Sequence, residues 1–74
     1  MVSNNEINSI MNLYVDEQIN YDDLLVILQE NNITLENRIY LLKKLFKIGK
    51  MDETIAADVR TIATHFNIDI SSYN

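Results

Sequence analysis

The feature that most constrains this chain is its near-lack of the two residues that make tight turns. Its 74 residues include no proline and one glycine, Gly49. β-Hairpins need residues that tolerate positive φ at their turns, so a turn-rich β architecture is disfavoured. Apolar residues make up 47% of the chain and charged residues 23%, which is the balance of a globular domain rather than of a disordered segment. The sequence therefore predicts an all-helical fold.

The chain lacks the usual means of reinforcing a small fold. It has no cysteine and a single histidine, His65, which excludes disulfides, thiolate metal sites and a histidine zinc cluster. We expect neither a metal nor a cofactor. A domain of this size buries only about 60% of the surface that its unfolded chain exposes. Association with a second copy would add buried surface, and we therefore expect a homodimer.

Capping signals and apolar periodicity predict four short helices. Ser3 and Glu6 have the spacing of a capping box, and Asn20 can cap a second helix whose first turn is acidic. Thr34 and Asp52 can begin two more helices. The predicted helices span about 4–18, 21–31, 35–48 and 53–66. Asn31 and Asn32 would provide a left-handed exit from the second helix, Gly49 a left-handed stop for the third, and Asn67 the end of the fourth.

Short connections between these helices predict a compact bundle with antiparallel neighbours. We expect one domain, 1–74, with frayed ends at residues 1–3 and 71–74. Apolar residues fill about half the circumference of the third helix, more than the stripe of roughly 100° that a surface helix needs. Part of that helix would thus be free for another chain, and the expected apolar interface is Leu41, Leu45 and Ile48. Replacing Leu45 with alanine should then lower both stability and mass.

Charge is segregated along the chain, whose net charge is -5. Residues 1–36 contain seven carboxylates and neither lysine nor arginine, whereas residues 37–50 contain five cations and no acid. One interpretation is that each charge solvates its own helix face. A second is an acidic surface that meets a basic protein partner, formed by Asp16, Glu17, Asp22, Asp23 and Glu30. A third is a basic face that contacts nucleic acid, formed by Arg38, Lys43, Lys44, Lys47 and Arg60, although a pI near 4.5 opposes it.

Catalytic chemistry has no visible constellation in the sequence. His65 lies beside Phe66 near the end of the fourth predicted helix, where a histidine is a favourable C-terminal cation. Neighbouring Asp22 and Asp23 project in different directions from a helix, so capping explains them better than a metal site. A single glycine excludes a glycine-rich phosphate loop. We therefore expect a protein that is not an enzyme.

Residues 59–68 resemble the first helix and turn of a helix-turn-helix motif. In that resemblance Ala63 is the small residue at the helix crossing, Phe66 and Ile68 anchor the core, and Asn67 stands where glycine is usual. A recognition helix would need about eight residues after Ser72, and two follow it here. Ordinary helix amphipathicity is therefore the interpretation we adopt.

Together these patterns predict a small non-enzymatic module for protein–protein interaction that inhibits or remodels a larger protein. The abundance of Asn, Ile, Lys and Tyr indicates AT-rich coding DNA, as in low-GC bacteria, their phages and mobile elements. The start of the chain lacks the basic and apolar regions of a signal peptide, and no apolar run is long enough to cross a membrane. We therefore expect a cytoplasmic location. The alternatives are a nucleic-acid-associated transcriptional regulator and a small scaffolding subunit.

Overall fold

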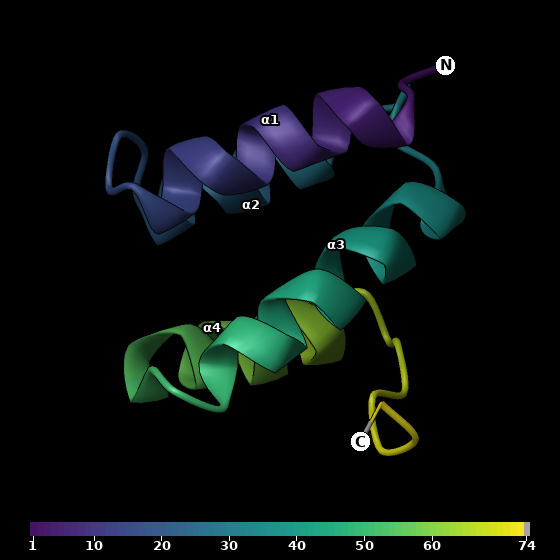
Figure 1. The fold of residues 1–74 in the computed structure, drawn as a ribbon. Coiled ribbons are helices and arrows are strands. Elements are labelled where there is room, and N and C mark those ends of the chain that lie inside the picture. The colour runs from purple at the N-terminus through teal and green to yellow at the C-terminus, as the bar shows by residue number, and fades with distance from the viewer. Residues whose placement is uncertain (74) are drawn as a thin grey trace. The chain divides into compact units, whose positions relative to one another are not determined.

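The fold consists of four α-helices. The computed structural model describes residues 1–73, and within that range it contains helices and no strand. The helices are α1 (Asn4–Val15), α2 (Tyr21–Leu28), α3 (Leu35–Gly49) and α4 (Glu53–His65), in chain order (Figure 1). The predicted all-helical class and the four predicted helices are confirmed.

The chain divides into two compact units. The first is Met1–Leu41, and the second begins at Leu42 and takes in the rest of the described chain. The boundary falls inside α3, so the first unit contains α1, α2 and the start of α3, whereas the second contains the remainder of α3, α4 and the tail.

Each helix begins with a side-chain cap at the predicted residue, and the four caps are Ser3, Asn20, Thr34 and Asp52. In the first three the bond is reciprocal, because Glu6, Asp23 and Asn37 accept in turn from the backbone N–H of their capping residue. The oxygen acceptors satisfy backbone donors that the first turn of a helix leaves without a partner.

Two helices end in the same left-handed motif. Glu17 has φ 62° after α1, and Asn67 has φ 57° after α4. The next residue in each case, Gln18 or Ile68, donates its N–H to a carbonyl in the last turn of the helix at 2.8 Å. This pattern is a Schellman motif. It confirms that Asn67 follows the end of the fourth helix, and it ends α1 three residues before the predicted residue 18.

The predicted left-handed exit from the second helix is wrong. The helix ends at Leu28, and neither Asn31 nor Asn32 has positive φ. Tightened turns continue the chain instead, because Glu30 donates its N–H to Ile27 and Ile33 donates to Glu30. Burial of Ile33, which is 5% exposed, draws this connection onto the core.

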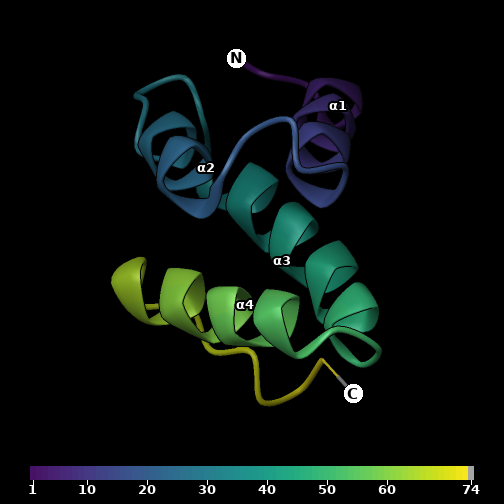
Figure 2. The same ribbon diagram turned by 90° about the vertical axis from the view of Figure 1, so that its left-hand side faces the viewer.

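The first unit has an apolar core and one buried polar side chain. Helices α1 and α2 contact each other and lie side by side (Figure 2). The core side chains of these two helices are Ile7, Met11, Tyr14, Leu24 and Leu28. Asn37 on α3 is 5% exposed, and its amide nitrogen donates to the Val2 carbonyl and to Asn4 Oδ1, each at 3.1 Å. Residue 2, placed by the sequence in a frayed end, is thus hydrogen-bonded to the folded chain.

The second unit is built around a close approach of α3 to α4. Its buried apolar side chains are Leu42, Leu45, Ile55, Val59, Ile62 and Ala63. Gly49 is the last residue of α3 and does not adopt positive φ, so its predicted role as a left-handed stop is wrong. A Cβ at this position would lie 3.0 Å from the Cα of Ala56. Glycine therefore permits the approach of the two helices.

The Gly49→Ala variant is expected to lower the free energy of unfolding by about 1 to 3 kcal/mol, the usual cost of overpacking. In an unobstructed helix the same change would stabilise by about 1 kcal/mol. The sign of the effect, measured by urea denaturation followed by circular dichroism, separates the two cases. Lys47→Ala, at an exposed position in the same turn, serves as the control and should change stability by less than about 0.5 kcal/mol.

The tail folds back on the second unit. Ile68 and Ile70 are half-buried, and the Tyr73 ring meets the Phe46 ring edge to face with a centroid distance of 6.0 Å. Lys43 Nζ lies 5.6 Å from the centroid of the Tyr73 ring. Tyr73, part of the predicted frayed end, is therefore packed in the structure, whereas Ser71 and Ser72 are exposed. Asn74 lies outside the described residues.

Candidate functional site

The predicted acidic interface is exposed throughout. The acidic face, as we call it, comprises Asp16, Glu17, Asp22, Asp23 and Glu30, all in the first unit and all exposed. Val26, one helical turn after Asp22 and four residues before Glu30, has 62% of its surface exposed. An exposed apolar side chain with carboxylates four residues before and after it resembles part of a protein interface, in which an apolar centre has a polar rim.

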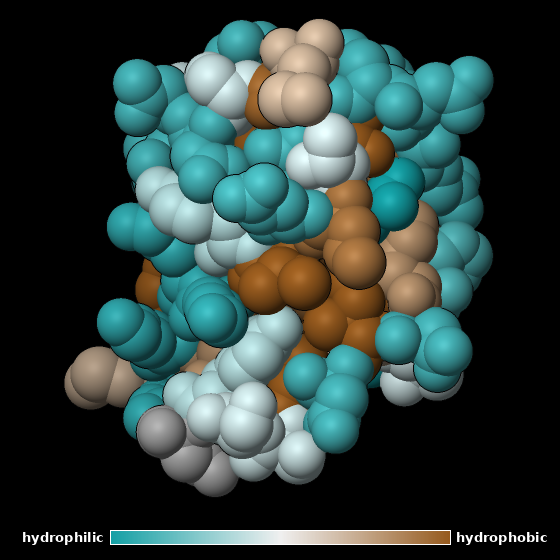
Figure 3. All heavy atoms as spheres, turned by 90° about the vertical axis from the view of Figure 1, so that its right-hand side faces the viewer, coloured by the Kyte–Doolittle hydropathy of each residue, from teal (hydrophilic) through white to brown (hydrophobic). Residues whose placement is uncertain are grey.

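The predicted apolar interface is placed differently. Leu41 and Leu45 have no exposed surface in the chain, and Ile48 is half-buried. The two leucines are core residues and offer nothing to a second copy while this packing holds. Large apolar side chains remain exposed elsewhere, at Leu13, Val26, Leu35 and Met51. In the space-filling view of Figure 3, hydrophobic side chains reach the surface among hydrophilic ones.

The cations of the predicted nucleic-acid face have different surroundings. Lys43, Lys44 and Lys47 are exposed on α3. Arg38 is half-buried, and its Nε donates to the Leu28 carbonyl at 2.9 Å, which satisfies an acceptor at the end of α2. Arg60 lies on α4 and forms an exposed ion pair with Glu53 at 3.1 Å. Arg38 therefore has a structural bond where the sequence predicted a phosphate contact.

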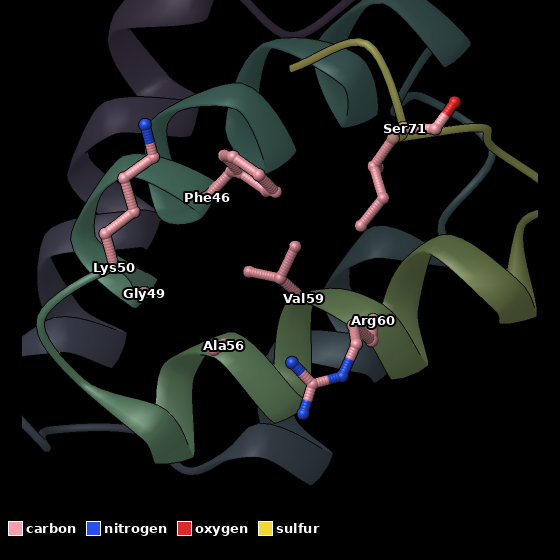
Figure 4. Close-up of a pocket in the computed structure, with 8 residues that line it drawn as sticks. Phe46, Gly49, Lys50, Ala56, Val59, Arg60 and Ser71 are labelled. Atoms are coloured by element: carbon pink, nitrogen blue, oxygen red, sulfur yellow. The ribbon is translucent and has the colours of Figure 1, made fainter. Parts of the chain in front are cut away.

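A mostly apolar cavity of about 330 Å³ lies between α3, α4 and the tail. We call it the α3–α4 groove, and it is lined by Phe46, Gly49, Lys50, Ala56, Val59, Arg60, Ile70 and Ser71. Phe46 and Val59 point into it from opposite sides (Figure 4). Lys50 and Arg60 add a positive charge to each helical wall, and Lys50 Nζ lies 5.6 Å from the Phe46 ring centroid. The groove thus combines an apolar interior with two exposed cations.

The tail beside this groove has two perturbed titrating groups. The pKa of Asp69 is lowered, because its carboxylate accepts hydrogen bonds from the backbone and side chain of Ser71. The pKa of Tyr73 is raised, first because burial disfavours the phenolate and then because the Asp69 carboxylate is negative. A second cavity of about 300 Å³ lies at the tail, between Lys43, Lys47, Ser72 and Tyr73.

Raising the pH is expected to detach the tail. A raised pKa in the folded state means that the Tyr73 contribution to stability is complete below about pH 10, the ordinary tyrosine pKa, and is lost as the pH passes the higher folded value. NMR shifts of the Phe46 ring protons report the contact with Tyr73 and should move when it breaks. Tyr73→Phe keeps the ring and lacks the hydroxyl, so its Phe46 signals should stay in place; equal movement in both proteins would contradict the assignment.

Within the described residues, the other features considered in the sequence do not come together as a site. His65 is exposed at the end of α4 with its ring packed edge to face on Phe66, at a centroid distance of 4.9 Å. Within residues 1–73, no three histidine or carboxylate side chains group in a way that could hold a metal ion. Nor does any helix in the described part of the chain have the length and apolar character required to cross a membrane.

Comparison with known proteins gives no assignment, since no family model, curated protein or solved structure matches the chain.

The α3–α4 groove is the feature that sequence reasoning missed. Its walls come from apolar residues of α3 and α4, Phe46 and Val59, and from a tail too short to show a helical period. The available signal was the pair of apolar tail residues, Ile68 and Ile70, whose partial burial returns the tail to the second unit. The cavity formed by that return also depends on the missing Cβ of Gly49. The sequence had predicted a different role for this glycine, that of a left-handed stop for the third helix.

Proposed function

We propose that the chain is a small non-enzymatic protein–protein interaction module of phage or mobile-element type, which binds and inhibits or remodels a larger protein. The observation that carries this proposal is the acidic face, in which exposed Val26 lies between Asp22 and Glu30 along the chain. Its carboxylates attract a basic surface and speed encounter, and Val26 gives an apolar contact that excludes water.

The larger partner is expected to present a basic surface, such as the nucleic-acid site of an enzyme or repressor. Charged groups on the acidic face would then reject acidic proteins and select basic ones. Binding should weaken as salt rises, because exposed charges farther apart than the Debye length, about 8 Å at physiological ionic strength, are largely screened.

The test is affinity capture from an extract of the source cells with three versions of the chain. The first is the parent, and the second, the face variant, carries Asp22→Asn, Val26→Ser and Glu30→Gln. The third carries Glu36→Gln and Glu53→Gln, which remove the same number of charges outside the acidic face. A protein held by the first and third versions and lost by the second is the expected result. Identical capture by all three would overturn the proposal.

The homodimer stays a prediction. It is tested by the mass of the chain in solution and not by the capture of a partner. Since Leu41 and Leu45 are buried within the chain, a dimer would use other surfaces. Light scattering after gel filtration, near 10 µM, in low and in high salt, measures it directly.

A further inference from the structure

The α3–α4 groove has room for an apolar side chain and carries charge on both sides of it. At about 330 Å³ it stands at the small end of the range for ligand pockets. Phe46 and Val59 make its interior apolar, while the cations Lys50 and Arg60 belong to opposite walls (Figure 4). An occupant matching this pattern is an apolar side chain with a carboxylate on either side.

The chain itself carries that pattern on the outside of α2. Val26 is 62% exposed, and the exposed carboxylates Asp22 and Glu30 stand four residues before and after it. In a helix, four residues correspond to about 6 Å along the axis, so the carboxylates flank the valine closely. Asp22 lies in the first turn of α2, and Glu30 lies in the tightened turn after its last residue.

We propose that the α3–α4 groove of one copy receives Val26 of a second copy, with Asp22 and Glu30 of that copy paired to Lys50 and Arg60. Charge complementarity selects this occupant, because the donor segment is acidic and the groove is flanked by Lys50 and Arg60, of which Arg60 would exchange its exposed pairing with Glu53 for a carboxylate of the second copy. The proposal rests on the proposed function in one respect, the use of the acidic face as an interaction surface.

Reciprocity would strengthen the association. Each copy owns both a groove and an acidic face, so a dimer with two-fold symmetry makes the same contact twice. The second contact forms at the high effective concentration that the first one creates. In this dimer the acidic face is covered, and a larger basic partner would bind the chain only by separating the two copies.

The test exchanges charge between the two surfaces. Variant one carries Asp22→Lys and Glu30→Lys, and variant two carries Lys50→Glu and Arg60→Glu. In each variant alone, like charges would face each other at both contacts, so the protein should elute as a monomer. In a mixed dimer both contacts are again complementary, one with the original signs and one with the signs exchanged, so an equimolar mixture should recover the mass of a dimer, twice 8.6 kDa. Light scattering at about 100 µM measures all four samples, including the parent.

Two controls keep the experiment decisive. Lys43→Glu with Lys47→Glu makes the same charge change on α3 outside the groove and should leave the dimer intact. If variant one loses helicity by circular dichroism, Asp22→Asn with Glu30→Gln replaces it and should weaken dimerisation at least tenfold.

The proposal would be overturned by a monomeric parent, by a dimer unaffected by both variants, or by a mixture that stays monomeric. A dimer that is lost in variant two but kept in variant one would also overturn it, because the proposed contact needs both the groove and the acidic face. The capture experiment is scored independently, since it follows a different protein and can succeed whether or not the chain dimerises.

Discussion

Leu24→Ala is expected to lower the free energy of unfolding by about 2 to 5 kcal/mol, the usual cost of emptying a leucine site in a core. Leu24 has no exposed surface, and it lies on α2, a helix of eight residues. Isolated helices of fewer than about 12 residues are marginal in water, so packing rather than propensity holds α2 together. A domain of this length has a total stability of roughly 4 to 11 kcal/mol, and the loss is a large part of it.

Thermal denaturation followed by circular dichroism measures this effect. In a domain of this size each kcal/mol shifts Tm by about 4 to 8 °C, so a fall of at least about 10 °C is expected. Asn12→Ala is the control, because Asn12 is exposed on α1 and belongs to none of the proposed contacts, and its Tm should stay within a few degrees of the parent. A parental Tm for Leu24→Ala would show that α2 does not depend on this side chain.

Asn37→Ala is expected to cost about 2 to 3 kcal/mol through polar groups left without partners. The Asn37 side chain accepts from the Thr34 N–H at 3.0 Å and donates to the Val2 carbonyl and Asn4 Oδ1. Alanine removes all three bonds at a site that is 5% exposed. It therefore releases the N-terminal residues as well as the start of α3.

Two other substitutions separate these contributions. Asn37→Asp keeps an acceptor for the Thr34 N–H but has no donor for Val2 or Asn4, so it should also destabilise. Thr34→Ala loses the cap and leaves the contacts to the N-terminal segment, and it should cost about 1 kcal/mol. Urea denaturation of all three variants gives the order, and a cost for Thr34→Ala equal to that of Asn37→Ala would mean that capping alone explains the role of Asn37.

Helix starts could be predicted from the sequence because the signals are local. Ser3, Asn20, Thr34 and Asp52 each satisfy backbone donors within the next three residues, so no distant contact is needed to place them. Helix ends were predicted less well. The end of α1 depends on Glu17 at φ 62°, a conformation that glutamate rarely adopts, and the residue type gave no indication of it.

The two candidate surfaces differ in the same way, because one follows from local signals and the other depends on tertiary structure. The acidic face could be predicted because exposed charge follows from the helix pattern alone. The apolar width of the third helix was real, yet periodicity does not tell whether a second apolar stripe meets another chain or the same one. Leu41 and Leu45 are buried within the chain, and the α3–α4 groove depends on how closely Gly49 approaches Ala56, which is a matter of tertiary structure.

The position of the unit boundary inside α3 has a consequence for how such a chain can evolve. Proteins exchange segments most readily where a cut falls in an exposed linker that few contacts cross. Here a cut between the units at Leu41 and Leu42 would sever a helix of 15 residues and leave each piece with a fragment too short to persist alone. The acidic face and the α3–α4 groove are therefore inherited together, and recombination at this boundary would yield neither half as a working part.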